Sequence, residues 1–511
     1  MSKKEKVKKQ YPEDLRSLLG FSLPNILLAF STVIYGMFMQ YLTDYSGIDA
    51  AIGIAGYAAG FGTIFLIVSR IIDALDDPIQ AWFMDSAKER PFGKYRLYTM
   101  CGIFLLATGM IAMFSIPDFV KSNKVLLAVW VFFWYLMFDM GSAFNGIMAI
   151  LQKATTDFKV RTKVMTWYRM FLILGGIPAA FFVPIATVMN AKYNDMGTSV
   201  SVTCRIVIVA AMLISLIGIA LLKERYIPEA DEQKEETKNE KPEKVSAKDV
   251  LFLLKTNKAM WVHNIAYVIG NSAYGFAGTM SVYFLKWYFC ADQATGVVNN
   301  EYYGAVNGTY GLLNIIGTLT APLVASWFTK KMGSVDRSGR TCMLASGIGY
   351  LVMFVFYLTG IMKISPFVYI ILYFLVSLPT SMATIPFLLL NVEVADYSEY
   401  KTGRNMTQIT NSVMNIISKT STALTTAIIG ALLVAFHYTV DSVSGNYAGD
   451  VSQIPSMINS FALFVTIVPA ACCLVCWIIY KKFYPITPEI REAMTAELKK
   501  KHEAANAESS N

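Results

Sequence analysis

The chain has 511 residues, of which 55% are hydrophobic and 16% are charged. Soluble domains devote about a quarter of their residues to charge, so this composition excludes an ordinary soluble protein and indicates an integral membrane protein. The net charge of +8 is explained by lysines and arginines in the connections between apolar runs. It therefore gives no reason to infer a nucleic-acid partner.

Apolar runs of roughly 20 residues can cross a hydrocarbon layer about 30 Å thick as helices. Twelve such runs follow one another along the chain. They lie near residues 18–42, 51–84, 97–116, 124–152, 164–190, 203–222, 259–288, 304–328, 341–361, 366–394, 408–436 and 457–480. The sequence therefore predicts an all-α membrane protein with twelve transmembrane helices.

Lysine and arginine are concentrated in alternate connections, from the N-terminal KKEKVKK to the C-terminal ELKKKH. Basic connections tend to remain in the cytoplasm, so we expect both termini there, which requires an even number of spans. The first span begins without a small-residue cleavage site, so we expect no removable signal peptide. A multi-pass protein of the cell's inner membrane is the expected location.

A charged and polar stretch, 229–249, divides the spans into two sets of six. Basic loops at 85–96 and 329–340 follow the second and the eighth span, a correspondence typical of transporters built from repeats, with the substrate between the halves. The predicted parts are a cytoplasmic N-terminal tail (1–17), a six-helix bundle (18–222), a cytoplasmic linker (223–258), a second six-helix bundle (259–482) and a cytoplasmic C-terminal tail (483–511).

The sequence lacks the usual motifs of membrane enzymes. It has three histidines and contains neither HExxH, nor GxSxG with a partnering histidine, nor the phosphate-binding loop GxxxxGK[ST]. We therefore expect a protein that is not an enzyme, has no cofactor, and is not driven directly by ATP.

The second span contains the run RIIDALDDPIQ, residues 70–80. At about 100° per residue, Asp77, Arg70 and Asp76 all lie within about 60° of the direction of Asp73 on the helix. A charge at the bilayer centre costs about 2.5–3.5 kcal/mol, so this face must line a water-filled cavity or a polar core. The alternatives are a structural Arg–Asp network and a cytoplasmic helix end just outside the hydrocarbon.

Three carboxylates and one guanidinium leave this face with a net charge of −2, which is costly in a purely structural network. Lys419, alone in the apolar eleventh span, would reduce the charge to −1 if it approached Asp73 and Asp77. One monovalent cation would then neutralise the site, either Na⁺ or Li⁺ on carboxylate oxygens or a proton on one aspartate. We therefore predict a cation site at Asp73, Asp76 and Asp77, with Arg70 and Lys419 as coupling residues.

Further polar side chains interrupt the apolar runs. Asp139 is a lone carboxylate in the fourth span, Asn145 lies close to two turns beyond it, and Arg169 opens the fifth span. Ionisable residues within a membrane are functional candidates by default, so these three, with Asn415 and Lys419, form the predicted substrate site. Interhelical hydrogen bonding is the alternative for Asn145. Nearby aromatic residues, which would stack on a sugar ring or lie in an interfacial belt, are Trp134, Tyr135, Trp167 and Tyr168.

Several of these residues together resemble the glycoside, pentoside and hexuronide cation symporters, the melibiose permease-like family of the major facilitator superfamily. The family pattern R-x-x-D-A-x-x-D-P, followed by G-K-[FY]-[RK], corresponds to Arg70, Asp73, Ala74, Asp77 and Pro78, followed by Gly93, Lys94, Tyr95 and Arg96. The run ADYSEYKTGR, 395–404, matches a second family motif imperfectly, and the cytoplasmic pattern D-x-x-x-R is formed by Asp157 and Arg161. The resemblance runs through most of the chain.

The resemblance implies a twelve-helix major facilitator fold with two six-helix halves and symport of a cation and a sugar by alternating access. It implies that Asp73 and Asp77 coordinate the coupling cation and that Lys419 links the cation site to the sugar site. Asp76 stands where melibiose permease has an asparagine of the same site. The added carboxylate would favour a proton or change the selectivity for Na⁺.

The resemblance also bears on the gate and the substrate. It implies that Asp157 and Arg161 belong to a cytoplasmic gate and that Arg169 lies near the sugar. Leu28 and Thr384 stand where the family has a galactoside-binding aspartate and a tryptophan, so we expect a pentoside, another glycoside or a uronide rather than a galactoside. The alternatives are a family member with a non-sugar substrate and a non-transporting sensor of the same fold.

Overall fold

The computed structural model describes Pro12 and residues 14–86, 93–154, 158–224, 257–402, 407–494 and 496–497. Within these ranges it describes the backbone but not the side chains of residues 71, 74–86, 94, 148–149, 152–153, 158–159, 161–162, 173, 322–323, 326, 402, 407–416 and 418–420.

Regular structure in the described ranges is helical, apart from two isolated bridges that join Ala291 to Val298 and Val440 to Tyr447. The helices are α1 (Leu15–Ser22), α2 (Pro24–Gly36), α3 (Phe38–Gln40), η1 (Tyr41–Tyr45), α4 (Ile48–Ile52), α5 (Tyr57–Ser86), α6 (Lys94–Met113), α7 (Asp118–Lys121), α8 (Lys124–Ala143), α9 (Ile147–Ala154), α10 (Phe158–Ala180), α11 (Phe182–Tyr193), α12 (Met196–Leu221), α14 (Lys258–Phe289), α15 (Asn300–Met332), α16 (Val335–Leu358), η4 (Ile361–Ile364), α17 (Pro366–Thr402), α18 (Thr407–Ala435), η5 (Val451–Gln453), α19 (Ile454–Val465) and α20 (Ile467–Phe483).

Most of these helices correspond to predicted spans. In the part of the chain that the structure describes, eight helical segments are long and apolar enough to cross a membrane: Leu15–Gly36, Tyr95–Met113, Lys124–Ala143, Lys163–Tyr193, Met196–Leu221, Val335–Leu358, Pro366–Lys401 and Val451–Phe483. The other four predicted spans coincide with α5, α14, α15 and α18. The prediction of an all-α membrane protein is therefore confirmed.

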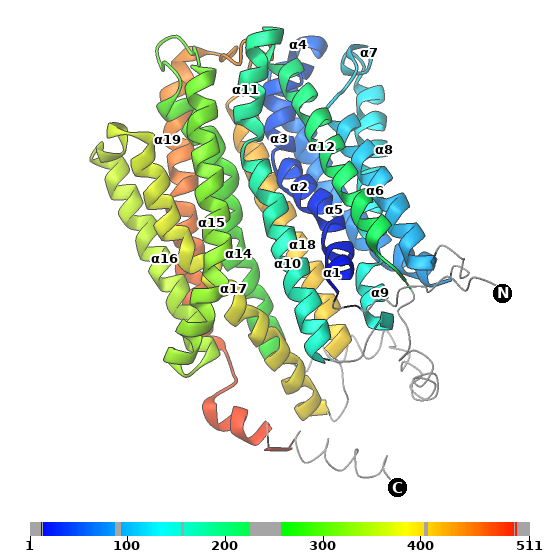
Figure 1. Cartoon of the computed structure of the whole chain (residues 1–511). Helices are drawn as coiled ribbons and strands as arrows, with labels where there is room; N and C mark the ends of the chain where they lie inside the picture. The colour runs from blue at the N-terminus through cyan, green and yellow to red at the C-terminus, as the bar shows by residue number, and fades with distance from the viewer. Residues whose placement is uncertain are drawn as a thin grey trace, which may run out of the picture. The chain divides into compact units, whose positions relative to one another are not determined.

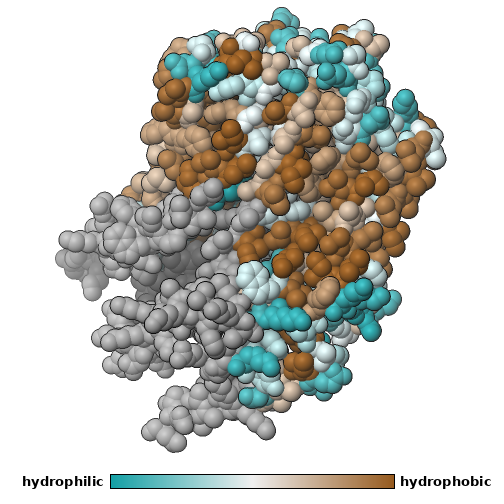
Figure 2. Space-filling view, turned by 180° about the vertical axis from the view of Figure 1, so that it is seen from behind, coloured by the Kyte–Doolittle hydropathy of each residue, from teal (hydrophilic) through white to brown (hydrophobic). Residues whose placement is uncertain are grey.

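Large apolar side chains are exposed at helical spacing on single helices. On α12 they are Ile206, Val209, Leu213 and Ile217, and on α16 they are Ile348, Leu351, Val352, Val355 and Leu358. Figure 2 shows that hydrophobic residues cover much of the visible surface. Residues three and four apart share one helix face, so these stripes are the surfaces that acyl chains would cover in a bilayer.

The chain divides into two compact units. Unit 1 contains residues 1–242, 290–315 and 430–452, and unit 2 contains residues 243–289, 316–429 and 453–511. In unit 1, α12 packs against α2, α6 and α11, while α6 also packs against α8 and α2 against α10 (Figure 1). In unit 2, α16 packs against α17 and α20, and α14 packs against α17, α19 and α20. Unit 1 holds the described part of the candidate cation site.

Candidate cation and substrate site

The first two charged residues of the predicted cation site are paired on α5. Arg70 and Asp73 are three positions apart, which places them on one face of the helix. Arg70 Nη1 donates a hydrogen bond to Asp73 Oδ2 at 3.0 Å. Asp73 is buried, with 5% of its surface exposed, whereas the Arg70 side chain is 27% exposed. A buried carboxylate needs compensation by charge and hydrogen bonds, and Arg70 supplies the opposite charge.

A tyrosine from a different helix completes the environment of this carboxylate. The Tyr135 hydroxyl, on α8, donates a hydrogen bond to Asp73 Oδ1. Tyr135 is itself buried, with 1% of its surface exposed. Arg70 of α5 thus donates to one oxygen of Asp73, and Tyr135 of α8 donates to the other. The carboxylate is therefore held from both sides.

Aromatic rings surround the pair. The Tyr35 ring of α2 lies under the Arg70 guanidinium, with 5.8 Å between Cζ and the ring centroid. The same ring lies 5.9 Å from the Tyr135 ring and 5.1 Å from the Phe138 ring, between centroids. A cation over an aromatic face is attracted by the ring quadrupole. Three helices, α2, α5 and α8, therefore contribute to the site.

The chemistry of Asp73 suits a monovalent cation. An ionised carboxylate offers two acceptor oxygens, and in Asp73 Arg70 donates to one of them and Tyr135 to the other. Oxygen ligands suit small hard cations, and a proton would bind the same positions. Asp73 thus has the chemistry that the sequence predicts for a cation ligand.

Asp139 lies one helical turn from Tyr135 on α8. Its side chain is half-buried. Residues four apart share one face of a helix. The predicted cation and substrate residues are therefore connected through α8, with Tyr135 between Asp73 and Asp139.

Asn145 occupies a break in the fourth predicted span. Helix α8 ends at Ala143 and α9 begins at Ile147, and the Asn145 side chain accepts a hydrogen bond from the Ile147 amide at 3.3 Å. This side chain caps an amide at the start of α9, a common use of asparagine at helix N-termini. Asn145 also forms a side-chain hydrogen bond with Tyr168 of α10, in agreement with the interhelical alternative.

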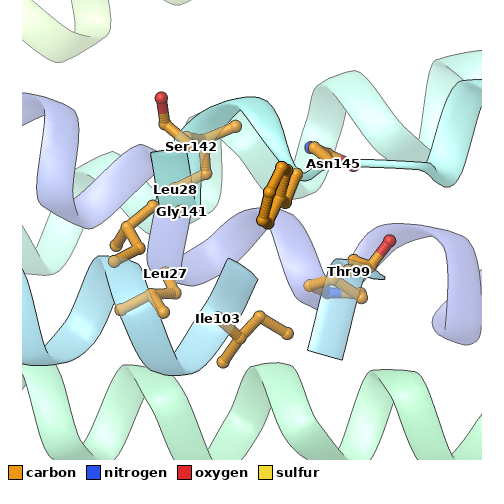
Figure 3. Close-up of a pocket in the computed structure, with 10 residues that line it drawn as sticks. Leu27, Leu28, Thr99, Ile103, Gly141, Ser142 and Asn145 are labelled. Carbon is orange, nitrogen blue, oxygen red and sulfur yellow. The ribbon is translucent and has the colours of Figure 1, made fainter. Parts of the chain in front are cut away.

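A small cavity lies beside this break, between α2, α6 and the end of α8 (Figure 3). Its lining includes Leu28, Thr99, Ser142 and Asn145, and its volume is about 20 Å³. One water needs at least about 10–15 Å³ by this measure, while ligand pockets are on the order of 300–1,000 Å³. The cavity can hold a water but not a sugar, so it is not a complete substrate site in this structure.

The remaining predicted site residues are distributed as follows. Arg169 lies on α10 with an exposed side chain. Asp157 lies outside the described residues, and so do the side chains of Asp76, Asp77, Arg161, Asn415 and Lys419. The structure therefore brings Asp73 of the predicted cation site together with the predicted coupling residue Arg70, and the predicted roles of all these residues stay predictions.

Two residues that surround the Arg70–Asp73 pair were not predicted from the sequence as parts of the cation site. Tyr135 is predicted above only as a sugar-stacking or belt aromatic, and Tyr35 is not singled out at all. The signal that could have identified Tyr135 is its position four residues before Asp139, in the run YLMFD. A hydroxyl on the same helix face as an intramembrane carboxylate is a candidate partner for charged groups nearby.

Segments far apart in the sequence close one end of unit 1. Three side-chain hydrogen bonds join them: Gln40 Nε2 to Tyr303 Oη at 2.8 Å, Tyr438 Oη to Asp44 Oδ1 at 3.0 Å, and Thr439 Oγ1 to Asp49 Oδ2 at 3.0 Å. The amides of Met196 and Gly197 also donate to the carbonyls of Val443 and Ser442. The connections that follow the first, fifth, seventh and eleventh predicted spans therefore contribute to one hydrogen-bonded end.

Comparisons with known proteins agree with this architecture. A family model described as MFS/sugar transport protein matches residues 19–488. The isoprimeverose transporter of Lactiplantibacillus pentosus is 27% identical, covering 97% of this chain and 91% of the relative. An uncharacterized symporter of Bacillus subtilis, YnaJ, is 24% identical and covers 91% of each chain. A solved D-xylose-proton symporter shares the fold, with a TM-score of 0.56 and 14% identity over 92% of this chain and 98% of that chain.

Proposed function

Since this chain belongs to the MFS/sugar transport protein family, we propose that it carries a sugar across the membrane together with a monovalent cation. The family match and the shared fold confirm two predictions made from the sequence, the major facilitator fold and a transporter rather than an enzyme. The relative YnaJ is named as a symporter, which supports the proposal that transport is coupled to a cation. The protein is accordingly a multi-pass membrane protein, and we place it in the cell's inner membrane.

The single observation that carries the cation proposal is the environment of Asp73. This buried carboxylate lies on α5 and pairs with Arg70 at 3.0 Å, and its oxygens are hard ligands of the kind that small cations prefer. Asp77, one turn further along, and Asp76 complete the proposed site. Na⁺, with Li⁺ as its analogue, and H⁺ are the candidate coupling ions, and Lys419 is proposed to couple the cation site to the sugar site.

A pentose-containing glycoside is the substrate class that we propose. The 27% identical relative is named as a transporter of isoprimeverose, and Leu28 replaces the aspartate that would bind a galactoside. Leu28 lines the small cavity beside Asn145 (Figure 3), whose lining includes no charged residue, so a carboxylate there would be costly to bury. Asp139, Asn145, Arg169 and Asn415 are the proposed substrate residues, and a uronide is the second candidate because Arg169 carries a positive charge.

Alternating access between the halves 18–222 and 259–482 is the proposed mechanism. The hydrogen-bonded end of unit 1 joins segments from both halves of the sequence, and such a sealed end is what one of the two access states requires. Asp157 and Arg161 are the proposed cytoplasmic gate. Cation and sugar binding share one coupling free energy, so each should strengthen the other by the same factor.

Transport into membrane vesicles tests the proposal. We expect vesicles with wild-type protein to take up labelled isoprimeverose against its gradient when an inward Na⁺, Li⁺ or H⁺ gradient is imposed, and we expect Asp73→Asn to abolish this accumulation. Asp118→Asn, at an exposed side chain between two predicted spans, is the matched control and should transport normally. If isoprimeverose only equilibrated across the membrane, whatever the ion gradient, the proposal of cation coupling would be wrong. Binding of isoprimeverose without any transport would favour the non-transporting sensor.

A further inference from the structure

The hydrogen bond between Tyr135 and Asp73 joins two helices at the charged pair. Tyr135 lies on α8, Asp73 lies on α5, and the two residues are 62 positions apart. The helices also contact each other elsewhere. A single hydroxyl group therefore connects the carboxylate of the proposed cation site to the helix that carries Asp139.

This bond depends on the charge state of the carboxylate. A phenol donates its hydrogen to a free lone pair of an ionised carboxylate. A proton on Asp73 would remove the ionised acceptor and leave a neutral hydrogen bond, which is roughly half as strong, and a metal cation on the same oxygen would repel the phenolic hydrogen. Either coupling ion therefore weakens or breaks the bond from Tyr135. The bond is strongest when the site is empty.

The phenol cannot respond by turning aside freely. The Tyr135 ring is fully buried and is packed by Phe65 at 5.2 Å edge-to-face, Tyr35 at 5.9 Å and Phe138 at 6.2 Å, between ring centroids. Close-packed interiors transmit displacements to their neighbours. A change at the hydroxyl is therefore passed to α2 through Tyr35 and to the α8 backbone on which Tyr135 and Phe138 stand.

We infer that Tyr135 is the positioning residue through which cation occupancy of Asp73 moves α8 and the substrate-side carboxylate Asp139. This inference rests on the proposed function, since it names how that site is coupled. Tyr135 need not touch either the cation or the sugar. Its role is to hold α8 in one position when the site is empty and to release it when an ion binds.

The variant that isolates the hydroxyl is Tyr135→Phe, which keeps the ring. Thermal unfolding of the purified protein is measured in NaCl, LiCl and choline chloride at fixed ionic strength and at two pH values. Through linkage it gives the half-stabilising concentration, which is the cation concentration that produces half of the maximal rise in melting temperature. Binding of isoprimeverose with and without the cation gives the coupling factor. We expect Tyr135→Phe to lower the half-stabilising concentration by about tenfold, since a hydrogen bond to a charged group no longer competes with the ion, and to bring the coupling factor close to one.

The control is Tyr41→Phe, which removes the hydroxyl of another buried tyrosine in unit 1 that packs on Phe38 and Phe114. A merely structural role for Tyr135 would lower the melting temperature equally in every salt and leave both the half-stabilising concentration and the coupling factor at the wild-type values. That result would overturn the inference. Weaker cation binding by Tyr135→Phe than by wild type would also overturn it, because it would show that the phenol is a ligand of the ion. If wild type itself shows no salt-specific or pH-specific stabilisation, the proposed function fails, and the inference fails with it.

A second measurement needs no variant. Hydrogen–deuterium exchange of the wild-type protein is compared with and without the cation that stabilises it. We expect the peptides of α8 around residues 135–139 to change exchange together with those of α5 around residues 70–77. A change confined to α5 would overturn the inference while leaving the cation site intact.

Discussion

Asp49 and Thr439 are 390 positions apart in the chain, yet Thr439 Oγ1 donates a hydrogen bond to Asp49 Oδ2 at 3.0 Å. The same carboxylate accepts hydrogen bonds from the amides of Gly56 and Ala58, and the Gly56 amide also donates to Thr439 Oγ1. These groups tie the loop after the first predicted span to the segment after the eleventh. They form part of the closed end of unit 1.

Thr439→Val is expected to loosen this end. The variant keeps the shape of the side chain but loses the donor to Asp49 and the acceptor for the Gly56 amide, so we expect the free energy of unfolding to fall by about 0.5–1.5 kcal/mol. Denaturing-detergent titration would measure it, and a double-mutant cycle with Asp49→Asn should show a coupling energy of similar size. Thr309→Val, whose hydroxyl donates within its own helix to the Ala305 carbonyl, is the control. Strictly additive effects of the two substitutions would contradict the pairing.

The pH dependence of stability should carry a contribution from Asp49. Desolvation by burial raises the pKa of this carboxyl above its ordinary value, against the opposing effect of its hydrogen bonds. The folded chain therefore binds the proton more tightly than the unfolded chain. The contribution of this proton to the free energy of unfolding is fully present below the ordinary aspartate pKa of about 3.9. It is lost as the pH rises through the raised pKa of the folded state.

Melting temperatures of wild type and Asp49→Asn across this range would measure the effect. Relative to the variant, wild type should be most stable at acidic pH and should lose that advantage toward neutral pH. Asp118→Asn should show the opposite trend or none, since the hydrogen bond from Lys121 lowers the pKa of that exposed carboxyl. A constant difference between wild type and Asp49→Asn would show that the Asp49 pKa is not raised.

Gly141 allows α8 to approach α6 closely. A Cβ atom there would lie 2.3 Å from the Leu106 amide nitrogen and 2.7 Å from the Gly102 carbonyl oxygen, and backbone atoms cannot move aside as side chains do. We expect Gly141→Ala to cost about 1–3 kcal/mol of stability, the usual range for overpacking. Gly36→Ala, where nothing lies within 4 Å of the added carbon, should leave the melting temperature nearly unchanged. Equal effects of the two substitutions would contradict this packing.

The long helices could be predicted from the sequence, because apolar runs of sufficient length leave a helix as the way to satisfy the backbone in a bilayer. Local interruptions could not. The run 124–152 is predominantly apolar, yet the helix breaks between Ala143 and Ile147. The first predicted span, 18–42, continues into a π-helical turn that ends at Tyr45, before Gly47 adopts a left-handed conformation with φ of 71°. Such details depend on neighbouring helices rather than on composition.

The same distinction applies to the candidate site. Arg70 and Asp73 could be paired from the sequence because helical periodicity alone places them together. The partnership of Asp73 with Tyr135 could not, because it depends on how α5 packs against α8. The bonds of Asp44 and Asp49 to the segment around residue 438 have sequence separations near 390, and no local pattern indicates them.

The C-terminal segment is held against unit 2 by an ion-pair cluster. Arg491 pairs with Glu393 on α17 and lies 3.4 Å from Asp336 on α16, and the Tyr484 hydroxyl donates to Glu393 Oε2 at 3.1 Å. Ile486 and Met494 are buried in an apolar cluster with residues of α14 and α17. The predicted C-terminal tail, 483–511, therefore begins as a packed part of the unit.

Arg491→Ala should release this segment. The substitution removes the charge partner of a largely buried Glu393, whose side chain is 12% exposed, so we expect a loss of about 1–3 kcal/mol and faster cleavage by trypsin after the lysines at 481, 482 and 499–501. Glu492→Ala, at an exposed position on the same turn, should change neither the stability nor the cleavage rate. Because Ile486 and Met494 stay available for packing, cleavage at wild-type speed in Arg491→Ala would show that the apolar contacts alone hold the segment and that the ion pairs contribute little.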